Sequence, residues 1–202
     1  MAAALDSLAA PRPLLWAGTD CRPLVIRAIG SDDADLLGAF YTALTPASRL
    51  NRFHVGIKEL PPRWLQALTH PDPDDELALL AVAEQDGRAA CIGEARYALD
   101  TETARGRDFA VAVADGWQGH GLGGRLLDAL LQHATQRGID QLHGDVLRDN
   151  LPMVALARRK GFAVATHPAD ARLLRVVRGL QPSWPAPAAA ASRWSSGQRA
   201  AH

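Results

Sequence analysis

A glycine-rich stretch in the second half of the chain carries the clearest chemical signal. Residues 118–124 read QGHGLGG, which places four glycines in six positions directly ahead of a leucine-rich helical pattern. Glycine in such a place sacrifices conformational entropy and packs nothing, so its use there indicates that bare backbone must come close to a ligand. The start of a helix offers unpaired main-chain amides and the positive end of the helix dipole, which together suit a pyrophosphate. The stretch therefore predicts a phosphate-binding loop.

Two other phosphate-binding motifs and a plain turn compete for the same residues. A P-loop requires a lysine and a hydroxyl residue after its last glycine, and it is excluded because Arg125 and Leu126 follow Gly124. The dinucleotide motif G-x-G-x-x-G is formally present, with Asp145 about twenty residues downstream. It is disfavoured because DGWQ separates it from the preceding strand and because too little chain follows to complete a dinucleotide-binding sheet. A simple strand-to-helix turn stays open, although a turn does not need four glycines.

The glycines lie between a predicted strand and a predicted helix. Residues 107–115 alternate in character, with Phe109 and two valines on one face and Asp108 and two alanines on the other. From Leu122 the leucines recur at helical spacing, and Gly138 is a C-terminal stop. The chain therefore predicts a strand, a phosphate-binding loop and a helix in direct succession.

The remaining patterns predict a mixed α+β domain with a parallel crossover in its middle. Strands are expected at 23–29, 77–85, 89–99, 140–147, 162–167 and 171–180, and helices at 32–44, 45–53, 61–69 and 150–160. Ser31 and Asn150 are the expected N-caps of two of the helices, and Asp86-Gly87 is the expected hairpin turn. The domain should occupy residues 23–180, between a variable segment at 1–22 and a flexible tail rich in Pro, Ala and Ser at 181–202.

Two blocks of the sequence resemble the acetyl-CoA-dependent N-acetyltransferases of the GNAT superfamily. Residues 118–123 match the signature Q/R-x-x-G-x-G/A at the start of a long helix, and residues 150–162 (NLPMVALARRKGF) are similar to the asparagine-led helix that ends in Gly-Phe. The resemblance implies the GNAT fold, which has a central, mostly antiparallel sheet with a splayed parallel pair and helices on both faces. It also implies acetyl-CoA as co-substrate.

The resemblance assigns the coenzyme to a defined set of residues. The pyrophosphate should meet the main-chain amides of the loop that begins at Gln118, and Arg125 should add positive charge. The strand before the loop should end at a bulge and pair its open edge with the pantetheine arm, which Asn150 and Met153 should also contact. The implied loop residues are Gly119, His120, Gly121, Leu122, Gly123 and Gly124, and the implied strand residues are Val111, Ala112 and Val113.

Acetyl transfer to an amine also needs a group that accepts a proton. The pKa of a lysine amine lies about three units above neutral pH, so removing its proton before the attack costs roughly 4 kcal/mol. The phrases LTPASRLNRF, GEARY and WQGHGLG resemble the acetyltransferase domains of bacterial protein lysine acetyltransferases over most of residues 24–180. In those domains a glutamate in a phrase similar to AEFAV is the base. Here RDFAV places Asp108 at that position, and a surface aspartate at a strand end is the competing interpretation.

Other candidates for acid–base roles are weaker. Glu94 on the adjacent strand is the second candidate for the base, and Glu84 and His143 are weaker candidates than Glu94. Many superfamily members carry a tyrosine four residues before the Gly of the Gly-Phe pair as general acid, but this chain has Ala157 there. We therefore expect the leaving thiolate to take its proton from water.

Composition limits the partners and the compartment. The chain has 22 basic and 22 acidic residues, which gives no reason to expect nucleic acid as a partner. Cys21 and Cys91 are too few for a disulfide framework, no metal site is expected, and no apolar run approaches membrane-spanning length. We expect a cytoplasmic enzyme that acetylates a protein lysine, and a homodimer stays open. A small amine as acceptor, or a regulatory module that binds CoA without turnover, are the alternatives.

Overall fold

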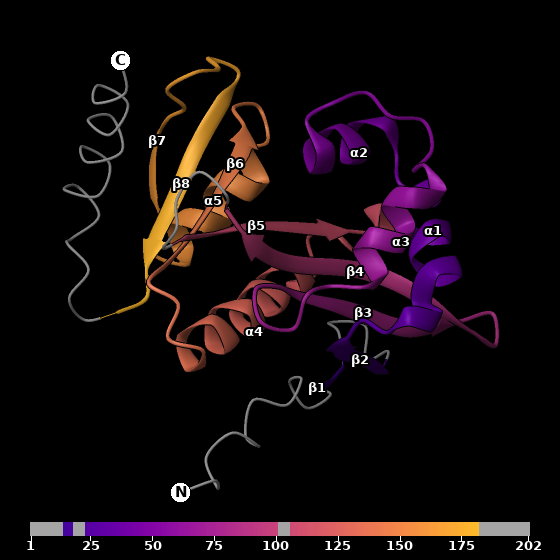
Figure 1. Cartoon of the computed structure of the whole chain (residues 1–202). Helices are drawn as coiled ribbons and strands as arrows, with labels where there is room; N and C mark the ends of the chain where they lie inside the picture. Colours follow the sequence, from indigo (N-terminus) through magenta and orange to yellow (C-terminus); the bar gives the residue numbers. More distant parts are fainter. Residues whose placement is uncertain (1–13, 18–22, 101–105, 182–202) are drawn as a thin grey trace, which may run out of the picture.

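The computed structural model describes residues 14–17, 23–100 and 106–181. Its strands form one sheet in the order β1-β2-β3-β4-β5-β6-β8-β7, and every neighbouring pair is antiparallel except β5 and β6 (Figure 1). The strands are β1 (Leu14–Ala17), β2 (Pro23–Ala28), β3 (Leu77–Gln85), β4 (Arg88–Leu99), β5 (Gly106–Val113), β6 (Gln141–Leu147), β7 (Ala163–Thr166) and β8 (Leu173–Gly179). The α+β class and the mostly antiparallel sheet with one parallel pair are as predicted.

Helices cover both faces of the sheet, also as predicted. Helices α1 (Ala34–Ala43), α2 (Pro46–Phe53) and α3 (Pro62–Thr69) lie on one face, and α4 (Leu122–Gln136) and α5 (Leu151–Arg159) lie on the other. Figure 1 shows α2 above the sheet and α4 below it. The leucines of α4 that recur at helical spacing are buried in the larger of two apolar cores, because that stripe faces the sheet. The smaller core packs α1 and α3 against β3, β4 and β5.

The parallel pair β5–β6 separates after three residues. The two strands pair only from Gly106 to Asp108, opposite residues 141–143, whereas β5 continues beside β4 to Val113 and β6 continues beside β8 to Leu147. A Cβ at Gly144 would lie 2.9 Å from the carbonyl oxygen of Phe109, so a glycine is required where the strands part. From Phe109 onward, none of the described strands pairs with the edge of β5 that faces β6. This is the predicted splay.

Three local features differ from the sequence predictions. Strand β1 pairs with β2 and lies inside the 1–22 segment that we expected to be outside the domain. The expected bulge at the end of β5 is absent from the described residues, since β5 pairs with β4 in continuous register. The irregularity lies between β3 and β4, where Ile92 has no partner on β3. Ser31 begins a 3₁₀ turn instead of capping α1, because the carboxylate of Asp33 turns back to accept the Gly30 amide at 2.7 Å.

The hairpin prediction is confirmed. Asp86 and Gly87 join β3 to β4 with φ values of 50° and 73°, the positive pair that a type I′ turn requires. Asn150 caps α5 through its side chain, which accepts the Met153 amide at 3.3 Å. None of the helices in the described ranges is long and apolar enough to cross a bilayer.

Candidate active site

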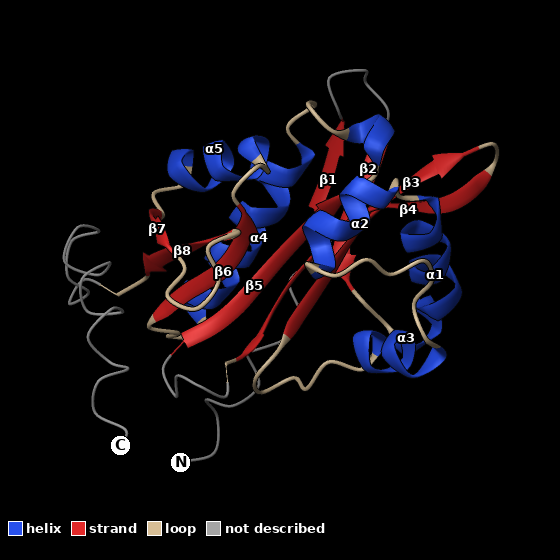
Figure 2. Ribbon diagram, turned by 90° about the horizontal axis from the view of Figure 1, so that it is seen from above, coloured by secondary structure: helices blue, strands red, loops and turns tan. Residues whose placement is uncertain are grey.

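A cleft of about 830 Å³ opens where β5 and β6 separate. Its floor is β5 from Asp108 to Val113, one wall is α2, and the other is formed by the end of β6 and by α5. Figure 2 shows α2 on one side of this junction and α5 on the other. The glycine-rich loop completes the cleft at the end of β5, so the topology brings the three predicted parts of the site together.

The loop presents bare main chain to the cleft. Gly119 and Gly121 have φ values of 78° and 89°, and a Cβ on either would meet no atom within 4 Å. Within the described part of the chain, none of the amides of residues 119–124 has a hydrogen-bond acceptor, and the first main-chain bond of α4 runs from the Arg125 amide to Gly121 at 3.2 Å. Six available amides at a helix N-terminus fit an anionic pyrophosphate.

Gln118 makes its contacts with the protein itself. Its side-chain amide donates to the carbonyl oxygen of Val113 at 3.1 Å and to the hydroxyl of Ser48 at 3.2 Å. The same hydroxyl donates to the carboxylate of Asp115 at 2.7 Å, and Asp115 also accepts the amide and hydroxyl of Thr45, both at 2.9 Å. Burial alone would raise the pKa of Asp115, but these bonds from Ser48 and Thr45 lower it. The loop is thereby tied to the first turn of α2.

The structure brings most of the predicted coenzyme residues to the cleft. Its lining includes these residues: Val111, Ala112, Val113, Gln118, Gly119, Gly121, Leu122, Gly123, Gly124, Asn150 and Met153. His120 and Arg125 are not part of it; the ring of His120 instead bonds the Gln118 carbonyl at 2.7 Å. Arg159 of α5 does line the cleft, although the sequence did not single it out.

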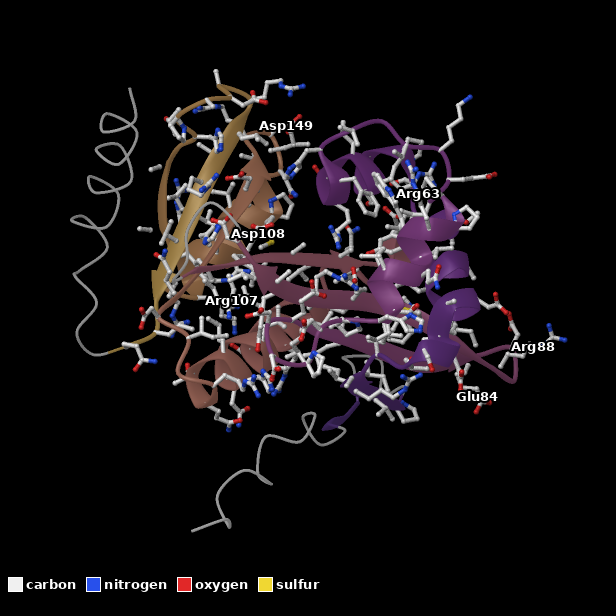
Figure 3. The ribbon with its side chains drawn as sticks, viewed as in Figure 1. Arg63, Glu84, Arg88, Arg107, Asp108 and Asp149 are labelled. Atoms are coloured by element: carbon white, nitrogen blue, oxygen red, sulfur yellow. The ribbon has the colours of Figure 1, made fainter. Side chains whose placement is uncertain are left out.

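Asp108 lies at the vertex of the splay. It is the last residue of β5 that pairs with β6, and its carboxylate opens to the cleft (Figure 3). Asp108 is exposed to the cleft, but the protein around its carboxylate partly excludes water and, with the nearby charge of Asp145, raises its pKa to about 6. A carboxylate of this pKa is ionised at neutral pH and can accept a proton there.

Glu94 occupies a different environment. It is fully buried, does not line the cleft, and accepts hydrogen bonds from the Tyr41 hydroxyl and from Arg96 at 2.7 Å, with Arg52 at 3.4 Å. Burial alone would raise the pKa of Glu94, but the charges of Arg52 and Arg96 lower it. This is the arrangement of a structural counter-ion, which favours Asp108 over Glu94 as a base.

The two weakest candidates are also away from the cleft lining. Glu84 is exposed near the tip of the β3–β4 hairpin, far from Asp108 (Figure 3). His143 is buried beside Asp100, whose carboxylate lies 3.1 Å from its Nε2, and burial lowers the pKa of the imidazole. No group of three or more potential metal ligands occurs within the described ranges.

Several side chains of the cleft were not identified as functional from the sequence. Asn51, Arg52 and His54 reach it from α2 and its C-terminus, and Asp145 reaches it from β6. Asp145 is held by the guanidinium of Arg175 and lies 3.4 Å from the imidazole of His167. These residues come from segments about ninety positions apart in the sequence. The only sequence signal for α2 was the similarity of LTPASRLNRF to a phrase in bacterial protein lysine acetyltransferases.

One family model and three known proteins are similar to this chain. Residues 42–162 match the model of the family described as Acetyltransferase (GNAT) family. The chain is similar to Acetyltransferase PA5475 of Pseudomonas aeruginosa, at 32% identity over 151 residues, which are 75% of this chain and 81% of that protein. It is also similar to Mycothiol acetyltransferase of Corynebacterium aurimucosum, at 41% identity over 69 residues, which are 34% of this chain and 22% of that protein. Among solved structures, the GNAT domain of S. lividans PAT matches with a TM-score of 0.74 at 25% identity, covering 83% of this chain and 97% of that one.

Proposed function

Because the chain belongs to the GNAT acetyltransferase family, and is therefore an N-acetyltransferase that uses acetyl-CoA, we propose that its acceptor is the side-chain amine of a protein lysine. Two observations support this acceptor. The chain resembles the acetyltransferase domains of bacterial protein lysine acetyltransferases over most of residues 24–180, and its fold matches the GNAT domain of S. lividans PAT with a TM-score of 0.74. The regulatory module without turnover has no such support.

The coenzyme occupies the glycine loop and the open edge of β5 in this proposal. The unpaired amides of residues 119–124 bind the pyrophosphate, and Arg159 adds the positive charge that we first assigned to Arg125. The main chain of Val111 to Val113 pairs with the pantetheine arm, which runs towards the vertex of the splay. Asn150 and Met153 contact the arm from α5.

Transfer proceeds by direct attack in a ternary complex. The amine nitrogen bonds to the thioester carbonyl carbon, its proton passes to the carboxylate of Asp108, and collapse of the intermediate breaks the carbon–sulfur bond. The single observation that carries this assignment is an ionisable carboxylate, with its pKa raised to about 6, at the vertex where the two strands part. Ala157 is buried and supplies no acid, so the thiolate takes its proton from water.

A small amine is the second candidate acceptor. Asp108, Asp145 and Asp149 all line the cleft, and three carboxylates would attract a cation. The similarity to Mycothiol acetyltransferase is a second reason to test small acceptors.

The test offers both classes of acceptor at once. The enzyme is incubated with labelled acetyl-CoA, a protein lysate and a panel of small amines, and the products are mapped by mass spectrometry. We expect label on protein lysines, lost in Asp108→Ala. Label confined to small amines would replace the proposed acceptor, and equal labelling by Asp108→Ala would remove Asp108 as the base.

A further inference from the structure

A buried cluster with unbalanced charge borders the cleft on the side of α2. It consists of Glu94 on β4, Arg96 two residues further along the strand, and Arg52 on α2, with the hydroxyl of Tyr41 between them. One carboxylate faces two guanidinium groups, so the cluster carries one net positive charge. Burying a charge without a close partner is costly, so it matters which of the two arginines has the weaker pairing with Glu94.

The two arginines are not equally satisfied. Arg96 donates to Glu94 at 2.7 Å and to the carbonyl oxygen of Leu68 at 2.7 Å. Arg52 makes two contacts with Glu94 at 3.4 Å, both to the oxygen atom that the Tyr41 hydroxyl already occupies more closely. Arg52 is therefore the member of the cluster with an incompletely paired charge.

Arg52 is also the member that reaches the cleft. Its side chain is only 10% exposed, yet it lines the cleft together with Asp108. Its guanidinium carbon lies 4.9 Å from the ring centre of Phe53 and 5.9 Å from that of Tyr41, so aromatic rings hold the group and exclude water from it. Glu94 is the only carboxylate within 4 Å of Arg52 among the residues that the structure describes.

We propose that Arg52 is an anion-recognition residue of the cleft, which binds a carboxylate carried either by the acceptor or by the acyl group of an acyl-CoA other than acetyl-CoA. Guanidinium and carboxylate groups match in bidentate geometry, and a desolvated cation gains most from such a partner. Glu94 is the positioning residue that keeps Arg52 at the wall of the cleft. The inference rests on the proposed transfer reaction, because it places both substrates in this cleft.

The carboxylate has two sources, which binding experiments separate. In the first arm, the dissociation constants of succinyl-CoA and acetyl-CoA are compared by calorimetry without an acceptor. In the second arm, acceptors are titrated into the enzyme saturated with CoA: a lysine peptide with Glu beside the lysine against the same peptide with Gln, and free lysine against 1,5-diaminopentane. Each pair differs in one carboxylate, and succinyl-CoA is also one methylene longer than acetyl-CoA.

Three variants assign the effect to Arg52. Arg52→Gln removes the charge, Arg52→Lys keeps the charge but loses the planar fork, and Arg63→Gln removes an exposed arginine of α3 that lies outside the cleft lining (Figure 3). We expect the wild-type enzyme to prefer the carboxylate-bearing member of at least one pair by about ten-fold. The preference should vanish in Arg52→Gln, weaken in Arg52→Lys and persist in Arg63→Gln.

Two results would overturn the inference. One is a wild-type enzyme that shows no preference for the carboxylate in either arm, and the other is a preference that survives in Arg52→Gln. Both arms measure binding, so a lack of acetyl transfer to lysine would contradict the proposed function without deciding the role of Arg52.

Discussion

Replacement of Asp108 by asparagine tests the proposed base most directly. The pKa of this carboxyl is raised to about 6, first by burial and then by the charge of Asp145. The carboxylate is then roughly nine-tenths ionised at pH 7 and roughly one-tenth ionised at pH 5. Since a base must be ionised to accept a proton, kcat/KM should fall about ten-fold per pH unit below 6, after correction for the ionisation of the acceptor amine.

Asp108→Asn should abolish this acid limb and lower kcat/KM at pH 7 by about 10²–10⁴-fold. The assay is initial-rate acetyl transfer between pH 5 and 9, with acetyl-CoA affinity measured by calorimetry at each end of the range. The affinity should not change, because the pyrophosphate binds at the other end of β5. An acid limb that keeps its position near pH 6 in the variant would refute the role of Asp108.

The same substitution should stabilise the fold. The folded-state pKa of Asp108 lies above its unfolded value of 3.8, so ionisation disfavours the folded state, and this destabilisation grows as pH rises from about 4 to about 6. Two pKa units correspond to roughly 3 kcal/mol, and solvent access to the side chain reduces this to about 1 kcal/mol. Urea denaturation at pH 7 should therefore show a higher midpoint for Asp108→Asn, which also excludes misfolding as the cause of lost activity.

Three further substitutions test other parts of the site. Gly121→Ala places a side chain at φ 89°, so strain of about 1 kcal/mol should weaken acetyl-CoA binding roughly five-fold by calorimetry; unchanged affinity would show that the loop conformation is not needed. Asp115→Asn weakens the bonds that hold Thr45 and Ser48, so faster hydrogen exchange in α2 and a several-fold higher acceptor KM are expected. Glu94→Gln leaves two buried arginines without a counter-charge and should cost about 3–5 kcal/mol in thermal or urea unfolding; a stable variant with the acid limb removed would instead make Glu94 the base.

The sequence predicted those parts of the fold that follow from local patterns. Alternation along β5, leucine spacing in α4 and the Asp86-Gly87 turn each dictate a local conformation, and the structure has all three. The sequence did not predict strand β1, because its four residues show no periodicity and form a strand only by pairing with β2. The expected Ser31 cap was wrong because a neighbouring aspartate competes for the same turn.

The candidate site was predictable only along a continuous stretch of chain. The glycine loop and the edge of β5 are adjacent in sequence, so a motif could identify both. Arg52 and Asp145 enter the cleft from separate segments, and their electrostatic roles depend on Glu94 and Arg175, which tertiary packing brings beside them. A motif likewise does not say which arginine faces the cleft, and the packing of α5 places Arg159 there.

One feature of the main chain explains why the proposed base and the proposed coenzyme edge lie next to each other. Strand β5 pairs with β6 up to Asp108, and Phe109 begins the unpaired edge, so the last paired residue of the strand marks the inner end of the open groove. Gly144 lets β6 stay close to β5 at this point, because a Cβ there would lie 2.9 Å from the Phe109 carbonyl oxygen and would force the two strands apart. A coenzyme arm that followed the edge of β5 inward, as proposed, would therefore end beside Asp108. In the proposed complex, the length of the β5–β6 pairing brings the reacting carbonyl and Asp108 together, and aspartate in place of glutamate shortens the reach across that junction by one methylene.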